Sequence, residues 1–328
     1  MENNNEKNII ISNIESVMHN SMIPYAEHVI LERALPRVED GLKPSMRMAL
    51  YANFTDKWVY PKKTGKFLKI IGSASRFCWH GDAATYGMLI RAAKPYALRY
   101  PLYEAQGSVG TLMDPESHGA PRYVEGRISE LGLNFFTNLE KGTIAEWREN
   151  YDNTEMYPSL LPSLGFWNIC NGTSGIGTGL ASSIPQFNIK EMNSALIDML
   201  WDREYKIPLP DFATGGILLN SAEVEKSLLN GTGAACKLRA RIIYNDKERK
   251  FIVKELPYAT YTNTICKELE ELVADENNGI EKFIDATGEN PDIEISLNKK
   301  GKPEEVLTLL FAKTSLSNKN LEYISTII

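Results

Sequence analysis

The sequence changes character near Tyr157, and this change limits the folds that the chain can adopt. After Tyr157, glycine and proline interrupt the chain repeatedly, at Pro158, Pro162, Gly165, Gly172, Gly175, Gly177, Gly179 and Pro185. Such residues break regular helices and favour turns. A chain of 328 residues is also long enough for roughly two domains, each with its own core. We therefore expect two parts of different architecture.

Three short helices are predicted in the first part. Pro44 suits the first position of one helix, Thr64 can cap a second, and Gly81-Asp82 opens a third that ends before Pro95. A segment broken by glycine and proline follows the third helix. This order fits a helix-turn-helix with a trailing wing, in which one helix enters the major groove of DNA. A plain helical bundle would show the same pattern and stays open as an alternative.

The second part mixes helices with strands. Polar and apolar residues alternate on both sides of Asn245-Asp246, which predicts a β-hairpin. The predicted helices cover 190–201, 264–274 and 303–313, and the predicted strands cover 237–244, 251–256 and 292–297. An α+β fold is therefore expected. Residues 1–32 are typical of an arm followed by a helix. The chain ends at Ile327-Ile328 directly after a polar stretch, which suggests that it is truncated.

The charges are distributed unevenly along the chain. The net charge is −6, but the stretch from Arg33 to Tyr100 holds thirteen lysines and arginines against four acidic residues. That stretch therefore carries +9, and the remainder carries −15. Such asymmetry is typical of a surface that binds a polyanion. Charge alone leaves two readings open, namely a DNA- or RNA-binding surface and a solvated basic face without function.

Several common chemistries are excluded by the sequence. It has no phosphate-binding GxxxxGK[ST] loop, no GxSxG turn and no HExxH metal site. The four cysteines stand far apart and form no CxxC pair, so a zinc site is not expected. No Asp-x-Asp pair is present to hold two magnesium ions. No apolar run reaches about 18 residues, and the N-terminus lacks a signal-peptide pattern, so a cytoplasmic location is expected.

The dipeptide Arg122-Tyr123 is a candidate nucleophile with its own cation. A tyrosine hydroxyl is a poor nucleophile at neutral pH because its ordinary pKa is about 10. A neighbouring cation favours the phenolate and stabilises charge on an attacked phosphate. A phosphotyrosine intermediate would conserve the energy of the broken phosphodiester. The dipeptide by itself is weak evidence, since Arg99-Tyr100 repeats it and a tyrosine packed on the wing is the alternative.

A series of short motifs resembles the breakage-reunion region of the A subunits of DNA gyrase and topoisomerase IV, which are type IIA topoisomerases. The motifs occur in the family's order and near its spacing, between residues 21 and 315. They are 33–47 (RALPRVEDGLKPSMR), 80–82 (HGD), 98–102 (LRYPL), 106–110 (QGSVG), 121–123 (PRY), 171–179 (NGTSGIGTG), 184–185 (IP), 212–216 (FATGG) and 255–258 (ELPY). Each motif alone is weak, but the ordered set is specific.

The resemblance implies roles for individual residues. Tyr123 would attack a DNA phosphate and hold the 5′ end covalently, and Arg122 would stabilise the charge that develops beside it. Arg33 and His80 match catalytic positions that line the cleaved phosphate. Ile176 matches an apolar wedge that enters between base pairs and bends the DNA, with ordinary core packing as the alternative. The expected DNA contacts, besides Ile176, are Lys43, Arg47, Lys62, Lys63, Lys66, Lys69 and Arg76.

The resemblance also implies an architecture and an assembly. The α+β fold would comprise an N-terminal arm and helix at 1–32, a winged-helix (helix-turn-helix) DNA-gate domain at 33–156, and a mixed α/β tower domain at 157–328. The chain would stop before a coiled-coil exit gate. Two copies would form a dimer on double-stranded DNA. A B-type subunit would complete an A2B2 complex and hold both Mg²⁺ and ATP, with no metal ligand in this chain.

The sequence departs from the family at positions near the expected active site. Many members have His-Pro-His-Gly-Asp where this chain has Cys78-Trp79-His80, and many have a second arginine at Met48. These departures motivate the alternative of a non-catalytic DNA-bending or scaffold relative. A winged-helix transcription factor is a third class, which the large second part disfavours.

Fluoroquinolones in this family rely on a Ser or Thr and on an acidic residue near the start of the third helix. Ala83 and Gly87 match those positions, which implies intrinsic resistance.

Overall fold

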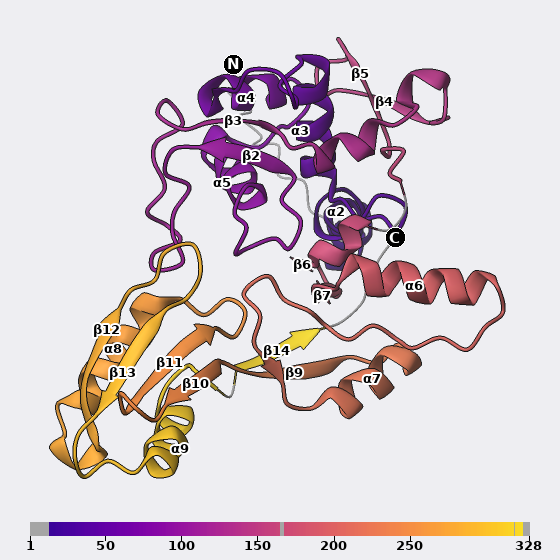
Figure 1. Cartoon of the computed structure of the whole chain (residues 1–328). Coiled ribbons are helices and arrows are strands. Elements are labelled where there is room, and N and C mark those ends of the chain that lie inside the picture. The colour runs from indigo at the N-terminus through magenta and orange to yellow at the C-terminus, as the bar shows by residue number, and fades with distance from the viewer. Residues whose placement is uncertain (1–12, 165–166, 318, 324–328) are drawn as a thin grey trace, which may run out of the picture.

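The computed structural model describes residues 13–164, 167–317 and 319–323 (Figure 1). Residues 1–12 of the predicted N-terminal arm and helix, and the chain end at Ile327-Ile328, lie outside the described residues. Helices and strands are both abundant, and several antiparallel sheets are present. The predicted α+β class is therefore confirmed. Within the described residues, no helix has the length and apolar character needed to cross a membrane.

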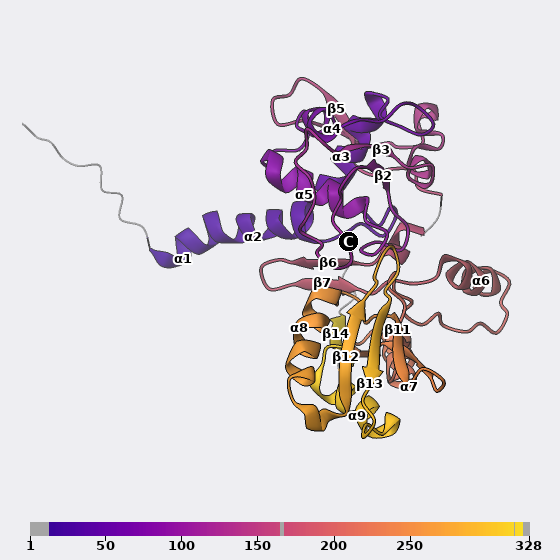
Figure 2. The ribbon, with the colours of Figure 1, turned by 60° about the vertical axis from the view of Figure 1, so that its left-hand side comes forward.

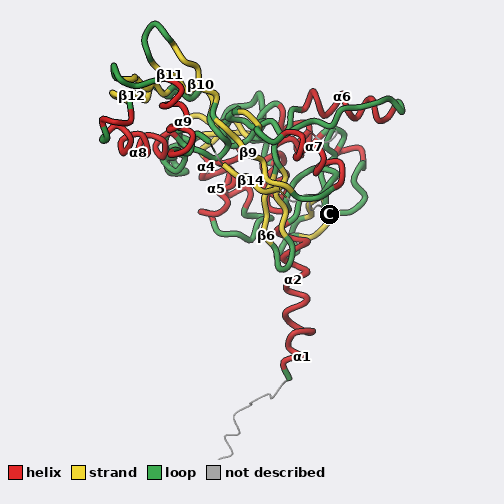
Figure 3. The backbone as a smooth tube through the Cα atoms, turned by 90° about the horizontal axis from the view of Figure 1, so that it is seen from below, coloured by secondary structure: helices red, strands yellow, loops and turns green. Residues whose placement is uncertain are grey.

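The first described element is a long helix that projects from the rest of the molecule (Figures 2 and 3). It consists of α1 (Ile14–Val17), the π-helical turn η1 (Met18–Met22), α2 (Ile23–Val29) and the π-helical turn η2 (Ile30–Ala34). The side chain of Asn13 caps its start by accepting a hydrogen bond of 3.1 Å from the backbone of Ser16. The helix ends at Leu35, whose extended conformation is the one favoured before Pro36.

The first body contains three helices and a small sheet. The helices are α3 (Pro44–Thr55), α4 (Phe67–Ala74) and α5 (Asp82–Ala92), and the strands are β1 (Gly65–Lys66), β2 (Tyr103–Gln106) and β3 (Glu125–Ile128). The strands form an antiparallel sheet in the order β1-β3-β2. The predicted first and third helices are confirmed, and the sheet excludes a plain helical bundle.

The prediction that Thr64 caps the second helix is wrong. The hydroxyl of Thr64 donates a hydrogen bond of 2.9 Å to Glu125, and α4 begins only at Phe67. The reason is that Gly65 and Lys66 pair with β3 as a short strand, so they cannot form the first turn of the helix.

A large apolar core joins the elements of the first body. It runs from Leu42 to Trp167 and includes Phe67 and Ile128, whose side chains are fully buried. The buried amide of Asn53 donates a hydrogen bond of 2.9 Å to the hydroxyl of Tyr103, so these two polar groups are paired inside the core. This core fixes α4 and α5 against the sheet, and it therefore fixes the surfaces that these helices present.

Short elements connect the first body to the second. They are η3 (Leu131–Phe136), η4 (Leu139–Lys141), β4 (Trp147–Glu149), β5 (Met156–Pro158), η5 (Trp167–Asn171), β6 (Thr173–Ile176) and β7 (Ala181–Ile184). β4 pairs with β5, and β6 pairs with β7 as a hairpin whose last register pair is Ile176 with Ala181. The glycines and prolines that are frequent in this part of the sequence thus coincide with hairpins and single-turn helices, as predicted.

The second body contains the remaining helices and strands. They are α6 (Ile189–Leu200), β8 (Ile217–Leu218), α7 (Ser221–Asn230), β9 (Ala234–Arg239), β10 (Arg241–Asn245), β11 (Lys250–Glu255), α8 (Thr262–Val273), η6 (Glu276–Asn278), β12 (Ile280–Asp285), β13 (Ile293–Leu297), α9 (Pro303–Lys313) and β14 (Lys319–Tyr323). One sheet has the order β10-β11-β13-β12, and another has the order β14-β9-β8. The predicted hairpin, helices and final strand are confirmed within one or two residues.

The predicted strand over 237–244 is interrupted at one residue. Ala240 is buried, and its backbone amide donates a hydrogen bond of 2.7 Å to the carbonyl of Leu316 rather than to a neighbouring strand. Before it, β9 pairs with β8 and β14. After it, β10 pairs with β11. The alternating pattern was therefore right about extended backbone, but it could not show that the segment belongs to two sheets.

Candidate active site and DNA interface

Tyr123 lies on an exposed turn that is anchored on both sides. Its side chain is 65% exposed, whereas the next residue, Val124, is fully buried in the first core. The carbonyls of Pro121 and Val124 accept hydrogen bonds of 3.1 and 2.9 Å from the backbone amides of Leu68 and Phe67, at the start of α4. The phenol is thus accessible to a large substrate while its backbone is held in place, as a nucleophile requires.

Arg122 lies over the ring of Tyr123. Its guanidinium carbon is 4.8 Å from the ring centroid, which is cation–π geometry. Both side chains are exposed. The structure therefore brings the predicted nucleophile and the predicted stabilising cation together, with the guanidinium free to contact an anion as well.

Lys66 and Glu125 form a polar clamp beside the Tyr123 turn. The ammonium of Lys66 lies 2.8 Å from the carboxylate of Glu125 and 3.5 Å from the carbonyl of Tyr123. The hydrogen bond from Lys66, followed by that from Thr64, lowers the pKa of Glu125 below its ordinary value. Lys66 was predicted to bind DNA, and nearly half of its side chain is exposed. Its position also ties the start of α4 to the nucleophile turn.

A second cluster of predicted site residues surrounds the end of η2. Arg33 is exposed on η2, and its charge, after burial, is the second cause that lowers the pKa of His80. The ammonium of Lys43 donates a hydrogen bond to the carbonyl of Ser174 on β6. Burial, and then the charge of Arg91, lowers the pKa of Lys43. Residues from four separate segments therefore meet on one cationic surface.

Gly175 allows the β6–β7 hairpin to approach this cluster. A Cβ atom at Gly175 would collide with the carbonyl oxygen of Ala34 and would lie 3.0 Å from the ammonium of Lys43. The neighbouring Ile176 is 87% exposed, so the alternative of ordinary core packing for this residue is excluded. The hairpin thus presents an apolar side chain to solvent next to the cations.

The two clusters are separate in this chain. Within the described residues, no hydrogen bond, ion pair or ring contact joins Tyr123 to Arg33 or to His80. Lys62 and Lys63, which precede β1, and Lys69 on α4 are exposed. Lys63 is close enough to Glu125, beside the Tyr123 turn, to contribute to its lowered pKa.

Arg47 does not lie on this surface, and its predicted contact with DNA is corrected here. Its guanidinium is buried and forms hydrogen bonds of 2.6 and 2.9 Å to Asp40 and of 2.8 Å to the carbonyl of Leu42. The side chain is 5% exposed, and that of Asp40 is fully buried. Asp40 also accepts hydrogen bonds from the backbone amides of Leu42 and Leu161. Arg47 therefore supports the loop before α3 rather than a phosphate.

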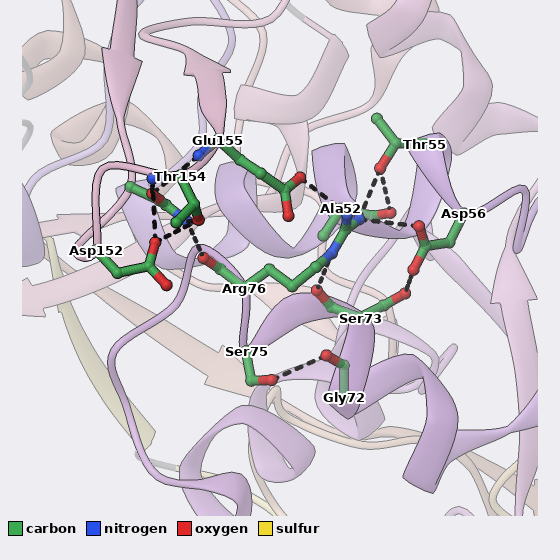
Figure 4. Close-up of polar contacts among 11 residues, drawn as sticks. Ala52, Thr55, Asp56, Gly72, Ser73, Ser75, Arg76, Asp152, Thr154 and Glu155 are labelled. Carbon is green, nitrogen blue, oxygen red and sulfur yellow. Dashed lines mark hydrogen bonds and ion pairs between the residues drawn. The ribbon is translucent and has the colours of Figure 1, made fainter.

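Arg76 is also committed to partners within the chain, as Figure 4 shows. Its guanidinium lies 2.9 Å from the carboxylates of both Asp56 and Glu155, and 3.0 Å from the hydroxyl of Thr55. Two carboxylates thus balance its charge, and it cross-links the ends of α3 and α4 to β5 and its preceding turn. Its predicted role as a DNA contact is not supported by this position, since the two carboxylates already neutralise its charge and weaken its attraction for a phosphate.

The comparisons with known proteins agree with this picture. The chain matches the family model of the DNA gyrase/topoisomerase IV A subunits over residues 33–328. It is 35% identical over 324 residues to the DNA gyrase A subunit of Buchnera aphidicola, covering 94% of this chain and 38% of that relative. It is 33% identical over 329 residues to the DNA gyrase A subunit of Pseudomonas aeruginosa, covering 95% of this chain and 35% of that relative. The chain therefore belongs to the family of DNA gyrase and topoisomerase IV A subunits, and it spans little more than a third of the length of these relatives.

Proposed function

We propose that this chain is the DNA breakage-reunion part of a type IIA topoisomerase and that Tyr123 is its nucleophile. The observation that carries the proposal is the exposed phenol of Tyr123, held on an anchored turn with Arg122 over its ring. The hydroxyl oxygen would attack a DNA phosphorus atom. The bond from phosphorus to the 3′ oxygen would break, and that oxygen would take up a proton. Tyr123 would then hold the 5′ phosphate until the 3′ hydroxyl reverses the step.

The fold supports this proposal in its details. We interpret α3, α4 and α5 with the β1-β3-β2 sheet as a winged-helix DNA gate, and the second body as the tower. Arg33, His80 and Lys43 would contact phosphates of the bound duplex, and Ile176 would enter between base pairs. A two-fold dimer would place two Tyr123 residues on opposite strands and produce a staggered double-strand break.

Mg²⁺ and ATP are proposed to be held by a B-type partner. Among the residues that the structure describes, no group of three or more His, Cys, Asp or Glu side chains is arranged to hold a metal ion. The described residues therefore do not fit a metal site, and no step is assigned to a metal in this chain. The function is tested by incubating the chain with a B-type partner, Mg²⁺ and supercoiled plasmid, and then denaturing. Linear DNA with protein on its 5′ ends is expected.

The alternative is a non-catalytic DNA-bending or scaffold relative. The buried Cys78 and Met48 favour it, since both replace polar or cationic groups of many family members. Burial raises the pKa of Cys78 to about 12, so its thiol adds no charge near the phosphate. Tight DNA binding without trapped protein, in the presence of a B-type partner proven active with a different breakage-reunion protein, would establish this alternative.

The projecting N-terminal helix is the proposed contact with the B-type partner. Its exposed apolar side chains are Ile14, Val17, Met18, Met22, Ile23 and Tyr25, each at least 45% exposed. Most of these side chains lie on one face of a helix that projects from the rest of the molecule, and such an exposed apolar face is normally covered by another chain. Replacing Met22 and Ile23 together with serine is expected to weaken binding to the B-type partner by roughly tenfold or more, because two large contacts are lost. Sedimentation of the mixed proteins measures this, and unchanged A2B2 assembly would refute the assignment.

Resistance to fluoroquinolones is a further expectation. Ala83 and Gly87 are exposed on α5, and neither side chain can form a hydrogen bond to a water. A Cβ atom at Gly87 would meet nothing within 4 Å, so an added side chain has room. Changing Ala83→Ser and Gly87→Asp together should lower the drug concentration that stabilises cleavage by roughly thirtyfold, at about 1 kcal/mol for each of two hydrogen bonds. Drug-stabilised cleavage by the unchanged chain at ordinary drug concentrations would contradict this expectation.

A further inference from the structure

Trp79 is an exposed aromatic side chain within the cationic surface around Arg33. It lies shortly before the start of α5 and is 43% exposed. The centroid of its ring is 6.3 Å from that of His28 on α2 and 5.9 Å from that of His80. Two imidazoles therefore flank the indole while much of its surface stays open to solvent. No role is assigned to this residue by the proposed cleavage reaction.

Trp79 and the hairpin that carries Ile176 lie against the same stretch of helix. Trp79 lies against His28, and the hairpin that carries Ile176 lies against the turn that follows. A Cβ atom at Gly177 would lie 3.3 Å from the side chain of Ile30 and 3.4 Å from that of Ala34. Two exposed apolar groups are thus presented beside one helical segment, whose last turn carries Arg33.

The surroundings of Trp79 indicate which ligand would cover it. Arg33 and Lys43 make this surface cationic, so a partner with a neutral or acidic face is favoured over a basic one. An open aromatic face among cations is the arrangement that binds nucleic acid when a base is free to stack. Bases become free where DNA is kinked, and the exposed Ile176 provides the chemistry for a kink. Lysines and arginines alone would bind phosphates, but they would leave the indole uncovered.

We propose that Trp79 stacks on a base of the bent DNA and forms a second apolar contact beside Ile176. That the DNA is bent at Ile176 is part of the proposed function, whereas stacking on Trp79 does not require cleavage by Tyr123. Because a purine offers a larger face than a pyrimidine, Trp79 would also favour a purine at the contacted position. It is therefore a binding and specificity-determining residue of this chain.

The test is the affinity of the whole chain for a DNA duplex that has a nick at its centre, measured over a range of KCl concentrations. Trp79→Ala is expected to weaken binding by roughly 5- to 100-fold, since stacking on an aromatic side chain contributes that much for each base. The slope of log affinity against log salt should not change, because no charge is removed. Lys69→Ala should instead reduce that slope by about one. Trp147→Ala, which removes an indole that is 37% exposed on β4, is the matched control and should leave the affinity unchanged.

Trp79→Phe separates stacking from folding. This variant should retain most of the affinity for DNA. Its tryptophan fluorescence should be quenched less by DNA than that of the unchanged chain, because the indole of Trp79 is absent. If Trp79→Ala binds as tightly as the unchanged chain, or if DNA quenches the Trp79→Phe variant as fully as the unchanged chain, the stacking proposal is wrong. Trapping of covalent complexes on the same proteins is scored separately. If the unchanged chain forms no covalent complex but its DNA affinity still depends on Trp79, the proposal that Tyr123 is the nucleophile is wrong and the stacking proposal stands.

Discussion

Tyr123→Phe should form no covalent complex with DNA, while binding the duplex as tightly as the unchanged chain does. The substitution removes only the hydroxyl, and the phenol is 65% exposed on a turn held by backbone hydrogen bonds, so the fold should not change. Loss of a covalent nucleophile typically lowers the rate of its step by roughly 10⁴- to 10⁶-fold. Cleavage should therefore fall below detection.

The measurement is the amount of linear plasmid after denaturation and protease treatment, with a B-type partner and Mg²⁺ or Ca²⁺ present. Tyr151→Phe is the matched control, because Tyr151 is also an exposed tyrosine of the first body (60% exposed) and lies in a different turn, between β4 and β5. It should cleave normally. Linear DNA with protein attached in the Tyr123→Phe reaction would show that another residue is the nucleophile, and Arg122 would then lose its proposed role as well.

Arg47→Met is expected to destabilise the protein by about 3–5 kcal/mol, the usual cost of leaving one charge of a buried ion pair without its partner. Asp40 is fully buried, and Arg47 supplies hydrogen bonds of 2.6 and 2.9 Å to its carboxylate. Asp40→Asn should have an effect in the same direction. The double variant should be less destabilised than the sum of the single variants, because it leaves no unpaired charge.

Denaturant unfolding of the single and double variants measures these free energies. Lys302→Ala is the control, because its ion pair with Glu305 is exposed at both side chains (74% and 70%) and such pairs contribute about 0–1 kcal/mol. If Arg47→Met retains the stability of the unchanged chain and loses only DNA affinity, Arg47 is a phosphate contact after all.

Local signals in the sequence were sufficient for most helices and strands. Pro44 begins α3 and Asp82 begins α5, because proline and an acidic residue are favourable in the first turn of a helix. The α8 and α9 helices were also predicted, and the β10–β11 hairpin followed from alternation on both sides of the Asn245-Asp246 turn. Thr64 failed as a cap because β1 pairs with β3, which comes about sixty residues later. Such pairing between distant segments leaves no local signal.

Charge in the sequence identified the cationic stretch, but it could not separate surface cations from paired ones. Lys62, Lys63 and Lys69 lie on the surface, as expected. Arg47 and Arg76 are bound to carboxylates, and in Arg76 one of these carboxylates, Glu155, is 79 positions away along the chain. Whether an arginine binds a ligand or a carboxylate of its own chain depends on the folded geometry, which composition does not encode.

The exposed side chains of the site could be predicted only in part. Tyr123 could be selected from fifteen tyrosines only with the help of the ordered motifs, since Arg99-Tyr100 has the same dipeptide. In the structure, Arg99 is paired with Asp211 and the hydroxyl of Tyr100 accepts a hydrogen bond from the backbone of Ile189. Trp79 was visible in the sequence as a departure from the family. Its openness and its imidazole neighbours became apparent only in three dimensions.

The interruption at Ala240 has a mechanical consequence for the second body. A single buried residue separates β9 from β10, so the chain passes from one sheet to the next without a loop. Hinges need several residues that can absorb changes in φ and ψ, and here the connecting residue is fixed by a hydrogen bond to Leu316. The two sheets cannot swing freely against each other. A force applied to the edge strand β14 would pass to β9 through the paired strands and on to β10 through the covalent junction at Ala240, and from there to β11 and β13 through the second sheet, so the second body would transmit displacement as a stiff lever.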